Sequence, residues 1–215
     1  ALQGIRDPED FRDLDMSCHS LQKVRCERFG KLVFVNFDSD APTLLEWLGP
    51  IAQEWEEFQL GSCRLASRAI FDLDCNWKIA MEANTEVYHV RSIHAKTIAP
   101  ILDDRRNVNT LYPNGHGRMV APVPGGQSSL KALRVSSDIA EIETAGEIAR
   151  TCHQSYGIFP NLVSPMSNLA VAPILFWPNG RNKCRMETWT IAPQWKEGMK
   201  PDLWTRYCPS FHSTL

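Results

Sequence analysis

Hydrophobic and polar residues alternate along the first third of the chain in patterns that predict a strand, a helix and a second strand. Lys31 to Phe37 is rich in β-branched and aromatic side chains and predicts a strand. From Thr43 to Phe58 apolar residues recur at helical spacing and predict an amphipathic helix. Gly49-Pro50 interrupts this stretch, so the helix is expected to break or bend there. Arg64 to Leu73 alternates imperfectly and predicts a strand.

Two further helices are predicted in the middle of the chain, with a loop between them. Asn76 is a suitable N-cap for a helix from Trp77 to His89. Pro113 to Gly126 contains four glycines and three prolines and predicts a loop. Asp138 to Arg150 predicts a helix.

The last third of the chain holds short extended runs, at Tyr156 to Val163, Leu169 to Trp177 and Arg185 to Ile191. Asn179-Gly180 lies between the last two runs and is a strong signal for a hairpin turn. Strands joined by hairpins, together with a few long helices, predict an α+β domain built on an antiparallel sheet. Helices on one face of that sheet could enclose a pocket.

Composition excludes several classes of protein. A length of 215 residues fits a single domain, and a net charge of -2 gives no electrostatic grip on nucleic acid or an anionic membrane. The most apolar stretch, Leu169 to Trp177, is about half the ~20 residues that span a bilayer and contains Pro173. The seven cysteines form no C-x-x-C pair, so a zinc ribbon is not expected. A reduced, cytoplasmic protein is expected instead.

One short stretch carries the residue types of a metal site. Glu86 and His89 are three residues apart and share a face of a helix, whereas His89 and His94 are five apart. On an ideal helix five residues turn by about 140°, so both imidazoles can reach one metal only if the helix ends or bulges between them. Two histidines and a carboxylate form the facial triad that holds Fe(II) and leaves positions open for dioxygen and substrate.

Chance remains an alternative for this pair, because a protein with six histidines sometimes has two at this separation. His116, in a Gly-rich loop, could line the mouth of a pocket, but an exposed loop position is expected. The tryptophans at 47, 55, 77 and 189 are expected to pack in the core. Cys75 and Cys152 are expected to be small buried hydrophobes.

The same stretch resembles the iron-binding segment of the Rieske non-heme iron oxygenases that hydroxylate aromatic rings. That family's pattern is N-W-K, then E-N-x-x-[D/E]-x-Y-H, then four residues and a second His. The residues in register are Asn76-Trp77-Lys78, Glu82, Glu86, Tyr88, His89 and His94. Further segments resemble the family in the same order along the chain: Leu32 to Asp38 with Asp40-Ala41-Pro42, Ile158-Phe159-Pro160-Asn161, and Trp177-Pro178-Asn179-Gly180 through Met186-Glu187.

The resemblance implies roles for these residues. His89 and His94 would be two iron ligands, and Glu86 would match the acid that bridges a ligand histidine and, across a subunit boundary, the Rieske cluster. Many relatives have Asp at that position. The family's Asn directly after the conserved Glu is Ala83 here, with Asn84 one position later.

Other parts of the family pattern are expected outside this chain. The Rieske motif, C-x-H with a later C-x-x-H, is absent, so the [2Fe-2S] cluster would lie on a preceding domain. The third iron ligand, an Asp in a late helix, would follow Leu215. The resemblance further implies an antiparallel sheet curled around long helices, known as the helix-grip fold. It also implies an organic, for example aromatic, substrate with O₂, a ferredoxin or reductase as electron donor, and a trimer or a complex with a β subunit.

Two other function classes stay open at this stage. A helix-grip module could keep the pocket, lose the iron and bind an apolar ligand without catalysis. A zinc hydrolase could use the same histidine pair. The residues after Leu215 would separate the first from the oxygenase, and metal analysis would separate the second.

Overall fold

The structure of this chain, a computed structural model, describes residues 2–124, 139–197, 200–202 and 204–205. Its strands are β1 (Arg25–Phe29), β2 (Leu32–Asn36), β3 (Arg64–Leu73), β4 (Val108–Leu111), β5 (Gly117–Pro122), β6 (Cys152–Ile158), β7 (Leu162–Met166), β8 (Ile174–Pro178) and β9 (Cys184–Ala192). Its α-helices are α1 (Leu44–Leu48), α2 (Pro50–Glu56), α3 (Trp77–Ala83), α4 (Val90–Ile93) and α6 (Glu147–Thr151). Among the described residues, 3-10 turns occur at η1 (Pro8–Asp10), η2 (Met16–Cys18), η3 (Ala99–Ile101), η4 (Asp104–Arg106) and η5 (Pro113–Gly115).

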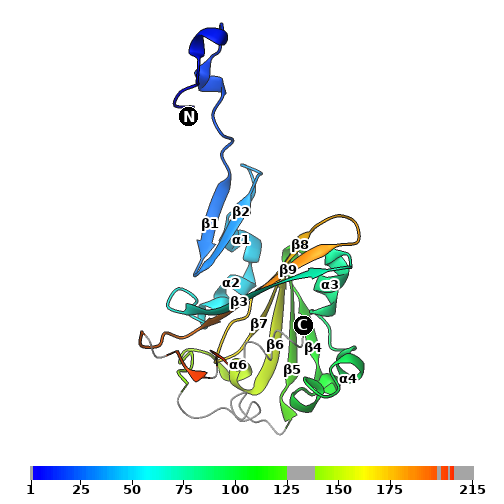
Figure 1. The fold of residues 1–215 in the computed structure, drawn as a ribbon. Helices are drawn as coiled ribbons and strands as arrows, with labels where there is room; N and C mark the ends of the chain where they lie inside the picture. The colour runs from blue at the N-terminus through cyan, green and yellow to red at the C-terminus, as the bar shows by residue number, and fades with distance from the viewer. Residues whose placement is uncertain (1, 125–138, 198–199, 203, 206–215) are drawn as a thin grey trace.

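Seven strands form one sheet in the order β3-β9-β8-β7-β6-β5-β4, and every neighbouring pair is antiparallel. From β4 to β9 each strand lies beside the next one along the chain, as hairpin connections require, and β3 closes the far edge against β9. The predicted α+β class with an antiparallel sheet is therefore confirmed. In Figure 1 the separate β1–β2 hairpin stands above this sheet, and residues 2–24 lead further away from it.

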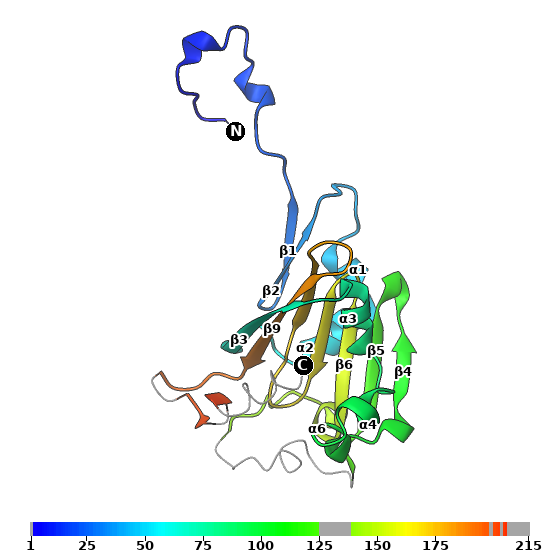
Figure 2. The same cartoon turned by 45° about the vertical axis from the view of Figure 1, so that its right-hand side comes forward.

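One face of the sheet is covered by α1 and α2 (Figure 2). Leu48 and Ile51 from these helices and Trp55 from α2 are fully buried against Tyr156 and Ile158 of β6. The Trp55 ring meets the Tyr156 ring edge-on, with their centroids 5.8 Å apart. A cluster of this size removes several large apolar side chains from water, each worth roughly 1.5–3 kcal/mol, and is the main core of the domain.

The opposite face of the sheet carries α3 and α4. Side chains of α3, among them Trp77 and Met81, pack on a cluster that includes Val163 and Phe176. Leu162, the neighbour of Val163 on β7, belongs to the cluster under α1 and α2. Because side chains alternate along a strand, Val163 points to the opposite face of the sheet. The sheet thus has a helix layer on each face, and the two layers bury different side chains.

The helix predictions are confirmed in part. The predicted helix from Thr43 to Phe58 is present and breaks at Gly49, where α1 ends and α2 begins with Pro50. The helix predicted from Trp77 to His89 is wrong beyond Ala83, because α3 ends there and a turn follows. Of the helix predicted over residues 138–150, position 138 lies outside the described residues, and only α6 at the end of the stretch is helical.

The prediction of long helices is wrong for the part of the chain that the structure describes, since its longest helices, α2 and α3, have seven residues each. Gly49 and Pro50 separate α1 from α2, whereas α3 ends with Asn84 as its C-cap residue, without a proline or glycine. The two faces of the sheet are therefore covered by short helices.

The strand predictions fare better, with two corrections. β3 has the predicted bounds, and the Asn179-Gly180 turn joins β8 to β9, with Gly180 at a φ of 103° that glycine adopts without strain. The loop predicted over residues 113–126 is wrong, because residues 117–122 form β5 between β4 and β6; residues 125 and 126 lie outside the described part. The extended run predicted from Tyr156 to Val163 is broken by the turn between β6 and β7.

Candidate functional site

The two histidines of the motif bracket the short helix α4. His89 is its N-cap residue and His94 its C-cap residue, and the His94 N–H donates to the Val90 carbonyl at 3.0 Å. The centroids of the two imidazole rings lie 5.1 Å apart, and the ring planes meet at 73°. A continuous helix would point side chains five residues apart to different sides. Here only the four residues between the histidines are helical, so the two rings can lie close together.

Glu86 fixes the orientation of His89. One carboxylate oxygen of Glu86 is hydrogen-bonded to His89 Nδ1, and the other accepts the backbone N–H groups of Tyr88 and, at 3.3 Å, of His89. A carboxylate on Nδ1 selects the tautomer in which Nδ1 carries the proton and Nε2 keeps its lone pair. This arrangement leaves Nε2 of His89 available to a metal ion.

The segment is held down on the sheet by apolar packing from α4. Val87 and Val90 are buried against Met119 and Ala121 of β5. On the outer side of the helix, Arg91 donates two hydrogen bonds of 2.6 Å to the carboxylate of Asp104. These contacts fix α4, and with it both histidines, over the end of β5.

His94 is a half-buried imidazole. Burial lowers its pKa below the ordinary histidine value, and the neighbouring His89 ring lowers the pKa further. Both causes disfavour the imidazolium. The neutral imidazole, which is the form that binds metals, is therefore favoured at His94.

A third metal ligand is not found beside this pair: within the described ranges, no group of three or more His, Cys, Asp or Glu side chains is arranged to hold a metal ion. Both carboxylate oxygens of Glu86 are hydrogen-bonded, one to His89 Nδ1 and the other to backbone N–H groups, so this carboxylate orients a histidine here. Two imidazoles bound to one metal through nitrogens about 2.1 Å from it lie close to each other, and the 5.1 Å between these rings fits that requirement.

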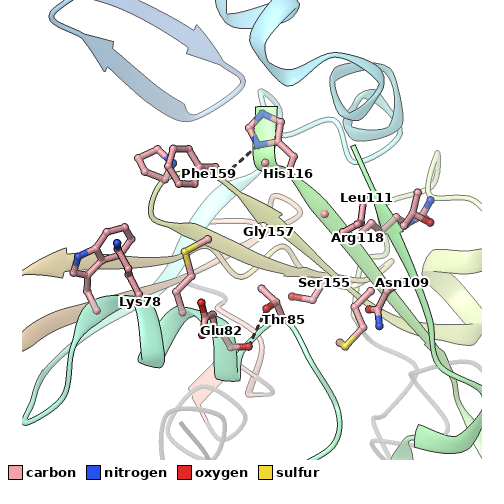
Figure 3. A pocket seen from close by; sticks show the side chains of 17 residues that line it. Lys78, Glu82, Thr85, Asn109, Leu111, His116, Arg118, Ser155, Gly157 and Phe159 are labelled. Atoms are coloured by element: carbon pink, nitrogen blue, oxygen red, sulfur yellow. Dashed lines mark hydrogen bonds between the residues drawn. The ribbon is translucent and has the colours of Figure 1, made fainter. Parts of the chain in front are cut away.

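A cavity of about 400 Å³ lies between α3 and the strands beneath it (Figure 3). One side of the cavity is formed by α3 and the residues just after it, among them Met81, Glu82 and Thr85. Its floor is β5 and β6, and its far wall includes Leu111 of β4 and Phe159. Neither histidine of the pair lines the cavity, but Thr85 does, and Thr85 is the residue before Glu86. The cavity and the histidine pair are therefore neighbours along one segment.

A family model described as the ring hydroxylating alpha subunit (catalytic domain) matches residues 60–208, which is well over half of the chain. The chain belongs to this family. The resemblance to Rieske oxygenases noted in the sequence is thereby confirmed for the catalytic domain. The matched range contains α3, α4, the histidine pair and all seven strands of the sheet.

Individual relatives of this ring-hydroxylating domain agree with the assignment. The chain is 36% identical over 116 residues to the 2-aminobenzenesulfonate 2,3-dioxygenase subunit alpha of an Alcaligenes species, covering 51% of the chain and 28% of that protein. It superposes on naphthalene 1,2-dioxygenase with indole bound at a TM-score of 0.71 and 22% identity, covering 97% of the chain and 52% of the other. A quaternary ammonium Rieske monooxygenase gives a TM-score of 0.73 at 17% identity, covering 97% and 54%. The two solved structures show the shared fold, and the chain spans about half of each.

His116 is the site residue whose predicted environment was wrong. It is 2% exposed, although it follows a glycine in the turn before β5. Its Nδ1 accepts the Phe159 N–H at 3.0 Å, its Nε2 lies 3.0 Å from the Trp47 carbonyl oxygen, and its ring packs edge-on against Trp47. Because Nδ1 is an acceptor, Nε2 carries the proton and donates to Trp47. The turn folds inward at this point because a buried imidazole satisfies two backbone groups there.

The other environments predicted for aromatic and sulfur side chains are mixed. Trp55 is fully buried as predicted, whereas Trp47, Trp77 and Trp189 are only partly buried, and Trp77 lines the cavity. The prediction that Cys75 and Cys152 are fully buried is wrong, because both are partly exposed. The reason is their position at strand and helix ends, where neighbouring elements do not cover them.

Sequence reasoning missed several residues of the ring-hydroxylating domain's cavity. Ser155, Gly117 and Gly157 line its floor, and His153 lies two residues before Ser155 on the same strand, opposite Ala121. None of them belongs to a short motif. Their alternation along β5 and β6 was the available signal, but it could not be used because residues 113–126 were predicted to be a loop.

Proposed function

We propose that this chain is the catalytic part of a Rieske-type oxygenase and that His89 and His94 bind a mononuclear ferrous ion. The observation that carries the proposal is the placement of the two imidazoles, 5.1 Å apart and at the two ends of α4, in a chain that belongs to the ring-hydroxylating family. Histidine nitrogens suit ferrous iron, and a two-histidine, one-carboxylate set leaves positions open for dioxygen and substrate. Iron bound there would supply the reduction of O₂ beside an organic molecule.

The chain's own residues would prepare that site. His89 would bind through Nε2, since its Nδ1 is hydrogen-bonded to Glu86. His94 would bind as a neutral imidazole, which its surroundings favour. Glu86 would be a positioning residue, and we further propose that it faces the [2Fe-2S] Rieske cluster that delivers electrons. The carboxylate ligand would come from residues outside those described, as we expect for an Asp beyond Leu215.

The organic substrate would occupy the cavity beneath α3. A volume of about 400 Å³ lies within the range of small-molecule pockets. The relatives are named as dioxygenases of 2-aminobenzenesulfonate and naphthalene and as a quaternary ammonium monooxygenase, so hydroxylation of an organic substrate is consistent with the family, and oxidative demethylation stays an alternative of our proposal. We propose an organic, ring-sized substrate and leave mono- and dioxygenation as alternatives.

The expected partners follow from the same proposal. Electrons would come from a ferredoxin or reductase, and the functional unit would be a homo-oligomer, such as a trimer, or a complex with a β subunit. We propose a cytoplasmic location, in line with the six cysteines among the described residues that are all free. Throughout the described ranges no helix has the length and apolarity to cross a membrane.

Iron content of histidine variants tests the proposal. The intact protein should hold one mononuclear iron per subunit. Iron that belongs to a [2Fe-2S] cluster is counted separately, from the content of acid-labile sulfide. His89→Ala and His94→Ala should each lose the mononuclear iron and all oxygenase turnover, whereas His19→Ala, at an exposed position in the N-terminal segment, should keep both.

Two outcomes would count against the oxygenase. Full iron content in His89→Ala would remove the pair from the metal site. A wild-type protein that binds a ligand but no iron would favour a non-catalytic ligand-binding module, and zinc in place of iron would favour a hydrolase.

A further inference from the structure

Two glycines stand side by side on the floor of the cavity. Gly117 of β5 is paired directly with Gly157 of β6, and the next position across, on β4, is Leu111. A Cβ at position 157 would lie 3.2 Å from Thr85 Cγ2, and one at position 117 would lie 3.6 Å from the Thr110 carbonyl oxygen. Thr85, which follows α3, therefore already covers Gly157, whereas the missing side chain at Gly117 leaves room on the floor of the cavity beside it.

Beside the glycines lies a second row of paired residues on the same face. It runs from Asn109 of β4 through Met119 of β5 to Ser155 of β6. The neighbours of Ser155 on β6, Gln154 and Tyr156, face the other way and bond to Arg118 and Glu54 under α2. The alternation of the strand therefore turns the Ser155 side chain toward α3 and into the cavity (Figure 3).

The Ser155 hydroxyl is buried and has no partner. The residue is 3% exposed, and its Oγ makes no hydrogen bond within the described part of the chain. Leaving a buried hydroxyl unpaired is unfavourable, so such groups in native proteins are usually explained by a water, an ion or a ligand. The surroundings on the cavity side are largely apolar, with Met81, Met119 and Phe159 nearby.

We propose that Ser155 is a specificity-determining residue: a flat, ring-sized substrate lies over Gly117, beside Thr85, and a polar substituent on its ring hydrogen-bonds to the Ser155 hydroxyl. This inference rests on the proposed function, since it names the class of substrate that the same cavity would take. Gly117 admits the face of a ring, and the hydroxyl selects one substituent on it. A ring whose substituent neither donates nor accepts a hydrogen bond would displace water from Ser155 without replacing its bond, and would bind more weakly.

Binding of a matched pair of probes tests this assignment. Aniline and toluene have nearly the same shape, but only the amino group of aniline can hydrogen-bond. Calorimetric titration of the intact protein with each probe should show that Ser155→Ala weakens aniline about 3- to 10-fold, the usual worth of one hydrogen bond, and changes toluene by less than about twofold.

Ser164→Ala is the matched control. Ser164 is also fully buried with an unpartnered hydroxyl, but it lies on β7 opposite Tyr156, on the α1–α2 face. Both alanine variants should be at least as thermally stable as the wild type, because each removes an unsatisfied buried hydroxyl. Only Ser155→Ala should change the ratio of aniline to toluene affinity.

Gly117→Ala tests the floor independently. The added methyl group has room in the backbone but projects into the cavity, so both probes should weaken by a similar factor, about 5-fold or more. An unchanged aniline-to-toluene ratio in Ser155→Ala would overturn the role of the hydroxyl, and unchanged binding of both probes in Gly117→Ala would overturn the seat of the ring. These titrations do not depend on iron, so either failure is distinct from loss of the iron site in His89→Ala.

Discussion

The two faces of the seven-stranded sheet are built from different kinds of residues. Under α1 and α2 the side chains are large and closely packed, and even the charged groups there are bonded to one another. Under α3 and α4 the sheet presents glycines and a cavity, with the histidine pair at its border. A strand that alternates between the faces can serve stability on one and ligand binding on the other.

β6 shows this division most clearly. Gln154, Tyr156 and Ile158 point into the α1–α2 core or its polar network, whereas Ser155 and Gly157 line the cavity. A fully packed face needs a snug fit at each position, and a ligand-binding face needs some positions left open. If this comparison is right, substitutions on the first face should mainly change stability, and substitutions on the second should mainly change binding.

The largest stability effect is expected at Trp55. Trp55→Ala should lower the free energy of unfolding by about 3–5 kcal/mol, because it leaves a large cavity in the main core. Urea denaturation measures this change. Tyr88→Ala is the control, since Tyr88 is 96% exposed and should change stability by less than about 0.5 kcal/mol. A smaller loss for Trp55 than for Tyr88 would break the comparison between the faces.

A second, smaller effect is expected at Glu54 on α2. Its carboxylate accepts hydrogen bonds from Tyr112 at 2.6 Å, from Tyr156 at 2.9 Å and from Arg118 at 3.2 Å. Glu54→Ala should cost about 2 kcal/mol, because it leaves the mostly buried Arg118 guanidinium without its carboxylate.

The control for Glu54 is the exposed ion pair between Asp72 and Arg185. Its groups lie on the strand surface and are half to two-thirds exposed. Thermal or urea unfolding of Asp72→Ala should show a much smaller loss of stability than Glu54→Ala, because solvent screens an exposed ion pair. Equal losses for the two carboxylates would mean that the network under α2 is not protected from solvent as the structure indicates.

The smallest effect of the three concerns His116 and depends on pH. Burial lowers the pKa of His116, and its Nδ1 must stay unprotonated to accept the Phe159 N–H. Its contribution to stability is therefore fully present above the ordinary histidine pKa of about 6.5 and is lost as pH falls below that value through the lowered folded pKa.

His116→Gln keeps a donor and an acceptor but cannot be protonated. It should cost about 1 kcal/mol at pH 7, and the difference from the wild type should shrink between pH 7 and pH 5. Urea denaturation of both proteins across that range measures the difference. A gap that widens on acidification would show that His116 is charged in the folded protein.

The sequence allowed the strands and the motif to be predicted better than the cavity. β3 and the Asn179-Gly180 hairpin follow from local alternation and turn chemistry, and the histidine pair follows from spacing combined with the family resemblance. The end of α3 at Ala83 could not be predicted, because helical spacing continues toward His89 although the chain turns there.

The cavity was missed for a physical reason. Glycines and prolines in residues 113–126 are typical of a loop, yet Gly117 lies inside β5, paired on both sides, and lines the cavity. The burial of His116 likewise depends on Trp47 and Phe159, which are far from it in sequence. Tertiary contacts of this kind override the local pattern.

Iron-edge anomalous scattering from crystals of the iron-loaded protein tests the central claim most directly. The account predicts a single mononuclear iron peak on the α3–α4 side of the sheet, about 2.1 Å from a ring nitrogen of both His89 and His94. A peak that contacts only one of these imidazoles, or an iron site elsewhere with this pair left free, would contradict it.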